Sequence, residues 1–129
     1  MRSHTELLDT FLTALGSGDM DALRPLLTED AIYVNPPYAM ESGTREGREA
    51  VLEALGSLSD TFELTDVTTT QERVEGDENR RLVVWHGPMR MKRFDAPLPN
   101  DGALVVDRTG DRISRIAWFR DVAEARVES

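Results

Sequence analysis

The chain has 129 residues, of which 40% are hydrophobic and 30% charged, and its net charge is −9. This is the composition of one ordinary globular domain, expected to span residues 1–129, and no apolar stretch approaches the roughly 20 residues that cross a bilayer. The chain has no cysteine, which excludes a disulfide, a thiol nucleophile and a thiolate metal site. It has two histidines, His4 and His86, which are too few for a zinc centre to be expected. The negative net charge argues against binding of nucleic acid.

Three helices are predicted in the first half of the chain. Ser3 and Glu6 have the S-x-x-E spacing of a capping box, and apolar residues then recur at helical spacing up to a pair of glycines. Asp19 can cap a shorter second helix, whose opening turns contain Pro25. A third helix is predicted within REAVLEALGSL, residues 48–58, where the apolar side chains form one stripe.

Strands dominate the second half. A first strand is predicted at AIYV, residues 31–34, and four more, separated by turn clusters, follow at about 62–75, 80–94, 103–109 and 112–121. The predicted helices come first in the chain and the hairpin-linked strands follow. This order predicts an α+β domain in which an antiparallel sheet is covered on one face by helices. The first few residues and the tail VAEARVES are expected to be loose.

The stretch RLVVWHGPMRMKRF, residues 81–94, leaves one orientation open. Strict alternation would place Trp85 and His86 on opposite faces of the strand. A Gly-Pro pair follows His86, however, and such a pair is typical of a bulge or an edge, which would exchange the faces beyond it. The face of His86 relative to Arg90 therefore stays undecided.

Three segments together resemble a known family of folds. These are the helical hairpin FLTALGSGDMDALRPLLTEDAIYVNPP, the helix GREAVLEAL and the late hairpin GDRISRIAWFRD. They resemble the cone-shaped domain shared by nuclear transport factor 2, ketosteroid isomerase, limonene epoxide hydrolase and the SnoaL-like polyketide cyclases. The resemblance covers nearly the whole chain. It implies a strongly curved sheet wrapped around three N-terminal helices, an apolar pocket open at one end, and a homodimer through the convex face of the sheet.

The chain departs from the catalytic residues of that family. In ketosteroid isomerases the position matching Asn35 is an aspartate that shuttles a proton, a task that an amide cannot perform. The hydroxyl donor that those enzymes carry on the first helix matches Phe11. Where the epoxide hydrolases carry an aspartate on the last strand, Trp118 lines up instead, with Asp121 three residues later. Neither of these two established mechanisms is therefore expected.

The resemblance also implies which side chains face the pocket. The first strand would contribute Tyr33 and Asn35, and the last strand Ile116, Trp118 and Arg120. Asn35 could orient a ligand carbonyl or hydroxyl, or equally tie down the Pro-Pro loop behind it. Arg120 could stabilise a developing oxyanion or form a cross-strand ion pair.

Acid or base chemistry has one leading candidate. His86 is the internal side chain whose unperturbed pKa, about 6.5, lies near neutrality, and Asp121 is its natural acidic partner. The alternative is a histidine on the convex face at a dimer contact. The predicted catalytic residues are His86, Asp121 and Asn35. The predicted substrate-binding residues are Tyr33, Tyr38, Trp85, Arg90, Trp118, Arg120, Ile116 and Phe11.

Two functions remain open from the sequence. The first is a cofactor-independent enzyme that acts on a small hydrophobic carbonyl or epoxide compound of polyketide, steroid-like or terpenoid type, as a cyclase, isomerase or epoxide hydrolase. The second is a non-catalytic module for small-molecule binding or dimerisation. The expected partners are a hydrophobic ligand and a second copy of the chain, without nucleic acid, membrane, metal or cofactor. No secretory signal is visible at the start of the sequence, so a cytoplasmic location is expected.

Overall fold

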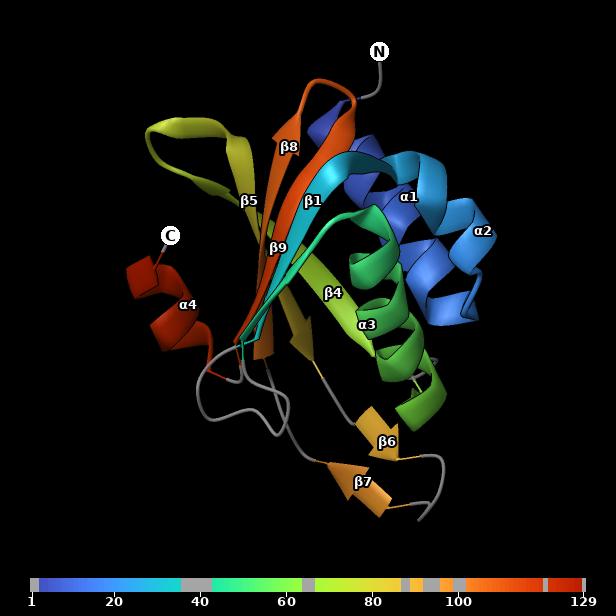
Figure 1. The fold of residues 1–129 in the computed structure, drawn as a ribbon. Helices are drawn as coiled ribbons and strands as arrows, with labels where there is room; N and C mark the ends of the chain where they lie inside the picture. Colours follow the sequence, from blue (N-terminus) through green and yellow to red (C-terminus); the bar gives the residue numbers. More distant parts are fainter. Residues whose placement is uncertain are drawn as a thin grey trace.

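The computed structural model describes residues 3–35, 43–63, 67–86, 89–91, 96–98, 102–119 and 121–128 (Figure 1). The helices in these ranges are α1 (His4–Ser17), α2 (Met20–Leu23), the 3-10 helix η1 (Arg24–Leu26), α3 (Arg48–Thr61) and α4 (Val122–Glu128). The strands are β1 (Leu27–Asn35), β2 (Gly43–Glu46), β3 (Phe62–Glu63), β4 (Thr68–Val74), β5 (Asp77–His86), β6 (Met89–Met91), β7 (Ala96–Leu98), β8 (Gly102–Thr109) and β9 (Arg112–Phe119).

Helix α1 begins and ends where the sequence predicts, but the second helix is shorter than its apolar pattern predicts: α2 ends at Leu23, and Leu27 already begins strand β1. The Ser3 Oγ caps α1 by accepting a hydrogen bond from the Glu6 N–H at 3.1 Å. Gly18 follows the last turn with a left-handed φ of 72°, a conformation that glycine adopts without strain. Asp19 caps α2, and Pro25 lies in η1, because proline lacks the N–H that would continue a regular helix.

One six-stranded sheet, with the strand order β2-β1-β9-β8-β5-β4, forms the main β layer, and β3, β6 and β7 form a smaller sheet. The α+β class and the curved sheet are confirmed, but the main sheet is mixed, because β1 and β9 run parallel while its other neighbours are antiparallel. Hairpin turns set the direction of strands that follow each other in the chain. No turn links β1 to β9.

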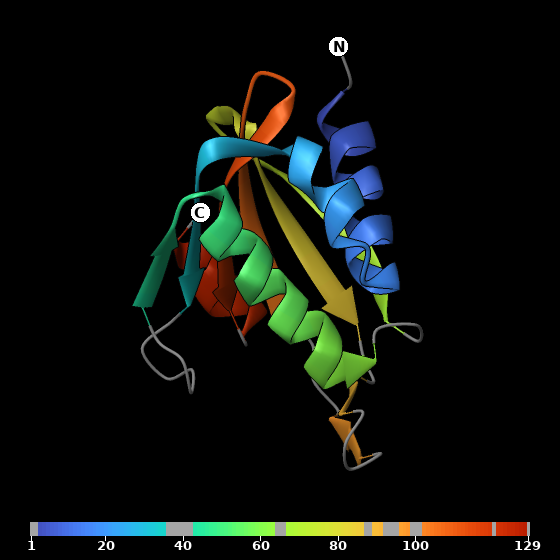
Figure 2. The same ribbon diagram turned by 45° about the vertical axis from the view of Figure 1, so that its right-hand side comes forward.

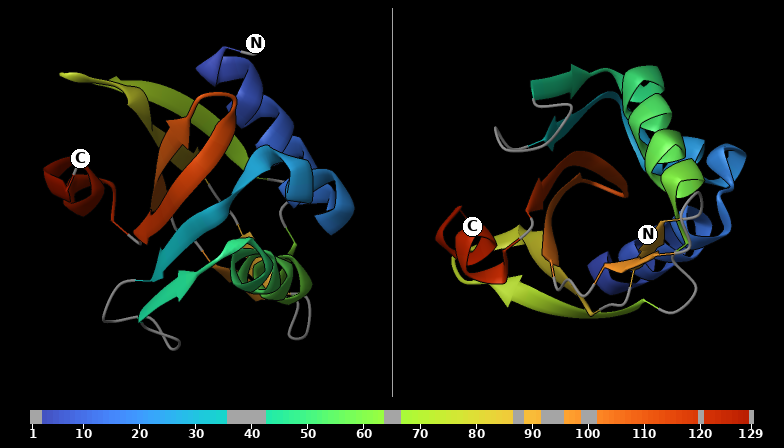
Figure 3. Two further views of the ribbon diagram at one scale, coloured as in Figure 1. Left: turned by 45° about the horizontal axis from the view of Figure 1, so that its top comes forward. Right: turned by 90° about the horizontal axis from the view of Figure 1, so that it is seen from below.

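The main sheet curves around the N-terminal helices. Figures 2 and 3 show α1 and α3 inside the curve and α4 on the opposite, convex side. The β8–β9 register shifts where Asp107 pairs with Arg115 and Arg108 with Ile113, which leaves one extra residue on β9. A bulge of this kind bends and twists a strand. It also lets both Ile113 and Ile116 face the concave core, in which each is at most 1% exposed.

Residues 122–128 of the tail form helix α4, which corrects the prediction of a loose C-terminus. The Asp121 Oδ1 caps this helix by accepting hydrogen bonds from the backbone N–H groups of Ala123 at 2.8 Å and Glu124 at 3.4 Å. Arg126 holds Glu72 on β4 with two bonds of 3.0 and 3.1 Å. The helix covers a convex apolar cluster made of Leu82, Val84, Ala103, Val105, Ala117 and Ala125. Seven residues are too few for a helical period to stand out in a sequence.

Two further strands lie in segments predicted as loops or turns. Strand β2 occupies part of the predicted loop ESGTREG and pairs with β1, and β7 lies within the turn cluster DAPLPNDG. The Gly-Pro pair after His86 is outside the described residues. None of the helices in the described part of the chain combines the length and the hydrophobicity needed to traverse a lipid bilayer.

His4 is a core residue that no sequence pattern marked. Its side chain, in the first turn of α1, is only 2% exposed. Burial lowers its pKa from 6.5 to about 4, and the charges of Arg108 and Arg81 act in the same direction, whereas the Glu78 backbone and the Asp107 carboxylate oppose them. The imidazole is therefore neutral in the folded protein at physiological pH.

Stability should consequently fall as the pH decreases from about 6.5 to about 4, because the unfolded chain gains a proton at His4 that the folded chain does not. The contribution approaches about 3 kcal/mol at the acid end. The variant His4→Leu should lose this part of the pH dependence in urea unfolding, whereas His86→Leu, at an exposed position, should keep it. Equal pH dependence in the wild type and His4→Leu would contradict this assignment.

Candidate functional site: an apolar cavity with two stacked indoles

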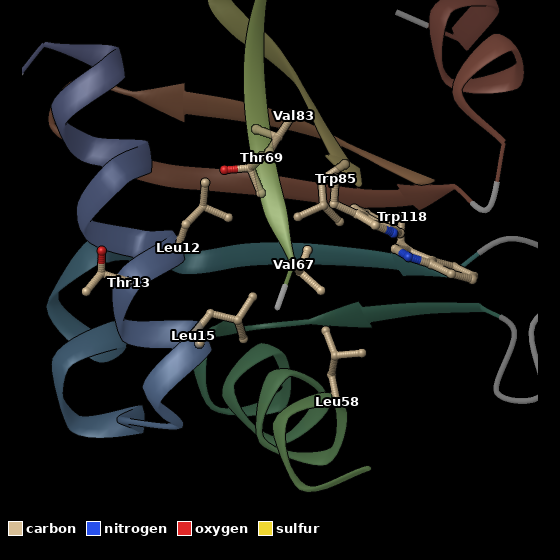
Figure 4. A pocket seen from close by; sticks show the side chains of 11 residues that line it. Leu12, Thr13, Leu15, Leu58, Val67, Thr69, Val83, Trp85 and Trp118 are labelled. Carbon is tan, nitrogen blue, oxygen red and sulfur yellow. The ribbon is translucent and has the colours of Figure 1, made fainter. Parts of the chain in front are cut away.

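A cavity of about 240 Å³ lies between α1, the end of α3 and the concave face of the main sheet. Figure 4 shows α1 on one side of it and two tryptophans on the other. Side chains on one face of α1 and one residue of α3 supply part of the wall, and β4, β5, β8 and β9 supply the rest. The polar side chains among the described lining residues are Thr13, Thr69 and the two indoles. None of the described lining residues has an acidic or basic side chain, so the cavity suits an uncharged molecule.

Trp85 and Trp118 form the most specific feature of this cavity. Their rings stack with centroids 6.1 Å apart and planes inclined by 9°. The two residues come from β5 and β9, which are separated in the sheet by β8. The pair therefore presents a flat aromatic wall that spans three strands.

Gly102 on β8 makes this stacking possible. It lies opposite Trp85 in the β5–β8 register, and a Cβ at this position would be 2.1 Å from Cζ2 of the Trp85 ring. Any side chain larger than hydrogen would push the indole away from the sheet. The glycine thus lets the Trp85 ring lie across β8 and reach Trp118.

The Trp85 side chain also carries an unused donor. Trp85 is 7% exposed, and its Nε1–H is buried without a hydrogen-bond partner among the described residues. A buried donor without an acceptor costs about 1–3 kcal/mol. An acceptor that reached the indole edge would remove this cost.

The predicted catalytic residues lie in three separate environments. His86 is exposed and follows Trp85 on β5, and strand alternation gives it the face of Leu82 and Val84, which belong to the convex cluster. Asp121 is exposed and caps α4. Asn35 is half-buried at the end of β1, opposite Gly43. The structure does not gather these side chains around the cavity.

The other predicted binding residues are buried in the concave core without lining the cavity, or lie outside the described part of the chain. Phe11, Tyr33 and Ile116 belong to the concave core and are at most 5% exposed. Burial raises the pKa of the Tyr33 phenol to about 12, which keeps it protonated at neutral pH. Tyr38 and Arg120 lie outside the part of the chain that the structure describes, and so does the side chain of Arg90.

Sequence reasoning missed the helical part of the wall. Leu12, Leu15 and Leu58 line the cavity, but their spacing in the sequence indicates only a buried helix face. The role of Gly102 depends on a ring from another strand, so nothing near it in the sequence could signal it. In the described part of the chain, no group of histidine, aspartate and glutamate side chains has an arrangement that could hold a metal ion.

The variant Gly102→Ala should displace the Trp85 ring and destabilise the protein by about 1–3 kcal/mol, as overpacking does in other cores. Loss of the near-UV circular dichroism signal of the coupled indoles would report the displacement. Gly56→Ala is a matched control, because a Cβ there would make only an ordinary contact of 3.5 Å with Met20 in an otherwise regular helix. An unchanged indole signal in Gly102→Ala would contradict the proposed packing.

Solved structures described as nuclear transport factor 2-like or cystatin-like share the fold of this chain. Within this class, the model of the SnoaL-like domain matches residues 8–116. The chain belongs to the SnoaL-like domain family. No curated protein matches the sequence.

Solved structures show the same fold at low sequence identity. A nuclear transport factor 2-like protein from Burkholderia xenovorans is 21% identical, with a TM-score of 0.71 over 96% of this chain and 92% of that one. A protein from Bacillus subtilis named as a candidate isomerase is 18% identical, with a TM-score of 0.76 over 96% and 91%. A protein with a ketosteroid isomerase-like fold from Catenulispora acidiphila, solved with trimethylamine, is 18% identical, with a TM-score of 0.71 over 92% and 86%.

Proposed function

We propose that the cavity binds a small, flat, hydrophobic compound that carries an uncharged oxygen. The observation that carries this proposal is the stack of Trp85 and Trp118 at one side of an apolar cavity. Flat unsaturated molecules bury large areas against indole rings. A charged ligand would lose its hydration in the cavity, and none of the described lining residues carries an opposite charge to compensate.

The size of the cavity narrows the ligand class. Its volume of about 240 Å³ is just below the range of roughly 300–1,000 Å³ typical of drug-sized ligands. Among polyketide, steroid-like and terpenoid compounds, this volume favours molecules with one or two rings over four-ring steroids. The buried Trp85 Nε1–H favours ligands with a carbonyl, ether or epoxide oxygen at the indole end.

Turnover of such a compound, by a cofactor-independent cyclase, isomerase or epoxide hydrolase, is the second part of the proposal. Its support is membership of the SnoaL-like family and the candidate isomerase among the structural neighbours. An indole N–H in a dry cavity can also stabilise negative charge on a ligand oxygen. The acid or base would come from outside the described lining, with His86 as the candidate from the sequence.

An isosteric pair of ligands tests the binding proposal. Titration monitored by tryptophan fluorescence should show 2-acetylnaphthalene binding about fivefold more tightly than 2-isopropylnaphthalene, because only the ketone accepts a hydrogen bond worth about 1 kcal/mol. Trp85→Phe should abolish this preference for the ketone. Trp118→Phe should weaken the binding of both compounds but keep the preference. Trimethylamine in the same titration separates cation binding by aromatic rings from binding of neutral ligands. The proposal fails if neither naphthalene binds up to its solubility limit.

The catalytic part needs a separate assay. Incubation of carbonyl and epoxide compounds with the protein, followed by NMR, would reveal product formation if the protein is an enzyme. A general acid or base role for His86 requires a rate loss of about 100-fold or more in His86→Ala. Unchanged turnover would exclude that role and is the result that strand alternation favours. If a compound binds but no product forms over a long incubation, the result would support a non-catalytic binding module.

We also propose a homodimer through the convex side of the sheet. Because α4 already covers the apolar cluster there, the contact would have to include α4. Val127 on this helix is 84% exposed, which is unusual for a large hydrophobic side chain. In sedimentation velocity, Val127→Glu should shift the protein toward the monomer, and Thr109→Glu, at the exposed end of β8, should not. A monomeric wild type would exclude the dimer.

A further inference from the structure

Three arginines meet at the end of the sheet where α1 begins. Arg73 on β4 lies directly opposite Arg81 on β5. Arg81 in turn pairs with Val106 on β8, and Arg108 follows two residues later. Paired residues share a face of a sheet, and Val106 belongs to the concave core. The side chains of all three arginines therefore extend from the concave face of the sheet. In Figure 1, the start of α1, the β4–β5 hairpin and the β8–β9 turn lie together at this end of the molecule.

The three positive charges are not neutralised within the described ranges. None of these arginines has an ion pair there, and Arg108 donates from Nε to the side-chain oxygen of Asn79 at 3.3 Å. Like charges directly opposite each other destabilise a sheet. The pKa of Arg81 is lowered by burial and by the charges of Arg73 and Arg108. An anion between the guanidinium groups would relieve this repulsion.

A neighbouring arginine shows what a satisfied site looks like in this sheet. Arg80 extends to the opposite face of β5 and holds Asp107 through Nε at 2.6 Å and Nη2 at 2.9 Å. This two-pronged geometry is the usual way in which a guanidinium binds a carboxylate or a phosphate. Arg73, Arg81 and Arg108 have the same guanidinium chemistry, but within the described ranges none of them pairs with a carboxylate.

The surroundings leave room and a positive balance for a ligand. The three arginines border a hollow of about 570 Å³, together with Arg80 and two carboxylates, Asp77 and Glu78. Guanidinium groups thus outnumber carboxylates there, although the whole chain has a net charge of −9. An anion attracted to this hollow is repelled by most of the remaining surface, which would focus it on these arginines.

His4 supplies an independent observation at the same place. The charges of Arg108 and Arg81 both act on its ring, and neither ring nitrogen makes a hydrogen bond of normal geometry among the described residues. A buried neutral imidazole has one N–H to donate. A ligand oxygen above the first turn of α1 would give both the arginines and this buried group an acceptor.

We propose that Arg73, Arg81 and Arg108 bind a doubly charged oxyanion group of a small molecule, either a phosphate or a dicarboxylate. The cavity lies near the other end of α1, because its lining includes Gly16, whereas the charges of Arg81 and Arg108 act on His4. Twelve residues of helix separate these two points by about 18 Å. The anion site is therefore distinct from the hydrophobic cavity, and its failure would leave the proposed function untouched.

Calorimetric titration with sodium phosphate at about pH 8, at constant ionic strength, tests the site on the intact protein. The wild type should bind phosphate or malonate saturably and more tightly than the monoanions acetate and chloride. Arg81→Met and Arg108→Met should each weaken binding about tenfold or more, because each removes a charge-assisted hydrogen bond. Arg112→Met removes the same charge from an exposed position on β9 and should stay within about twofold of the wild type. Comparison of the two dianions identifies which chemistry the site prefers.

Thermal unfolding without added anion separates binding from folding. Arg81→Met should be at least as stable as the wild type, because the substitution removes like-charge repulsion. Phosphate should then raise the melting temperature of the wild type and of Arg112→Met but not that of Arg81→Met. If Arg81→Met fails to fold, Arg73→Gln, at an exposed position, replaces it in the titration. The proposal is overturned if the wild type binds neither dianion up to about 10 mM, or if the Arg112 and site variants weaken binding equally.

Discussion

Burial of the apolar face of α1 in the hollow of the curved sheet is the interaction on which the structure depends. Leu7, Leu8 and Phe11 on this helix have no exposed surface. Each fully buried side chain of this size contributes roughly 1.5–3 kcal/mol to folding. The sheet can enclose the helix only because it bends, and the bulge between β8 and β9 adds to that bend while keeping Ile113 and Ile116 in the core. The cavity is the part of this hollow that the helix leaves unfilled.

The apolar character of the cavity agrees with what the sequence lacks relative to other members of the fold. By the resemblance to ketosteroid isomerases and epoxide hydrolases, Phe11, Asn35 and Trp118 are expected at positions where those enzymes have groups that donate or transfer protons. In the structure, Trp118 takes part in an aromatic wall and Phe11 is plain core. Any catalysis in this chain would therefore use a different arrangement from the two established ones.

The periodicity of the sequence predicted the helices, the main strands and the α+β class, because each depends on local spacing. It did not predict the parallel pairing of β1 with β9, the helix α4 or the burial of His4, because each of these depends on partners distant in the chain. The resemblance to a family supplied the curvature of the sheet and the expectation of an apolar pocket. It placed Trp118 and Tyr33 on the concave side, but the exposed position of His86 follows only from the pairing of its strand.

Within the described part of the chain, the main sheet does not close into a barrel, and β2 and β4 form its edges. Exposed edges invite pairing with strands of other molecules, which is a route to aggregation. Both edges here are poor templates: all four residues of β2 are exposed and include Arg45 and Glu46, and β4 begins with three exposed threonines before its charged residues. Both edges therefore discourage the addition of a foreign strand.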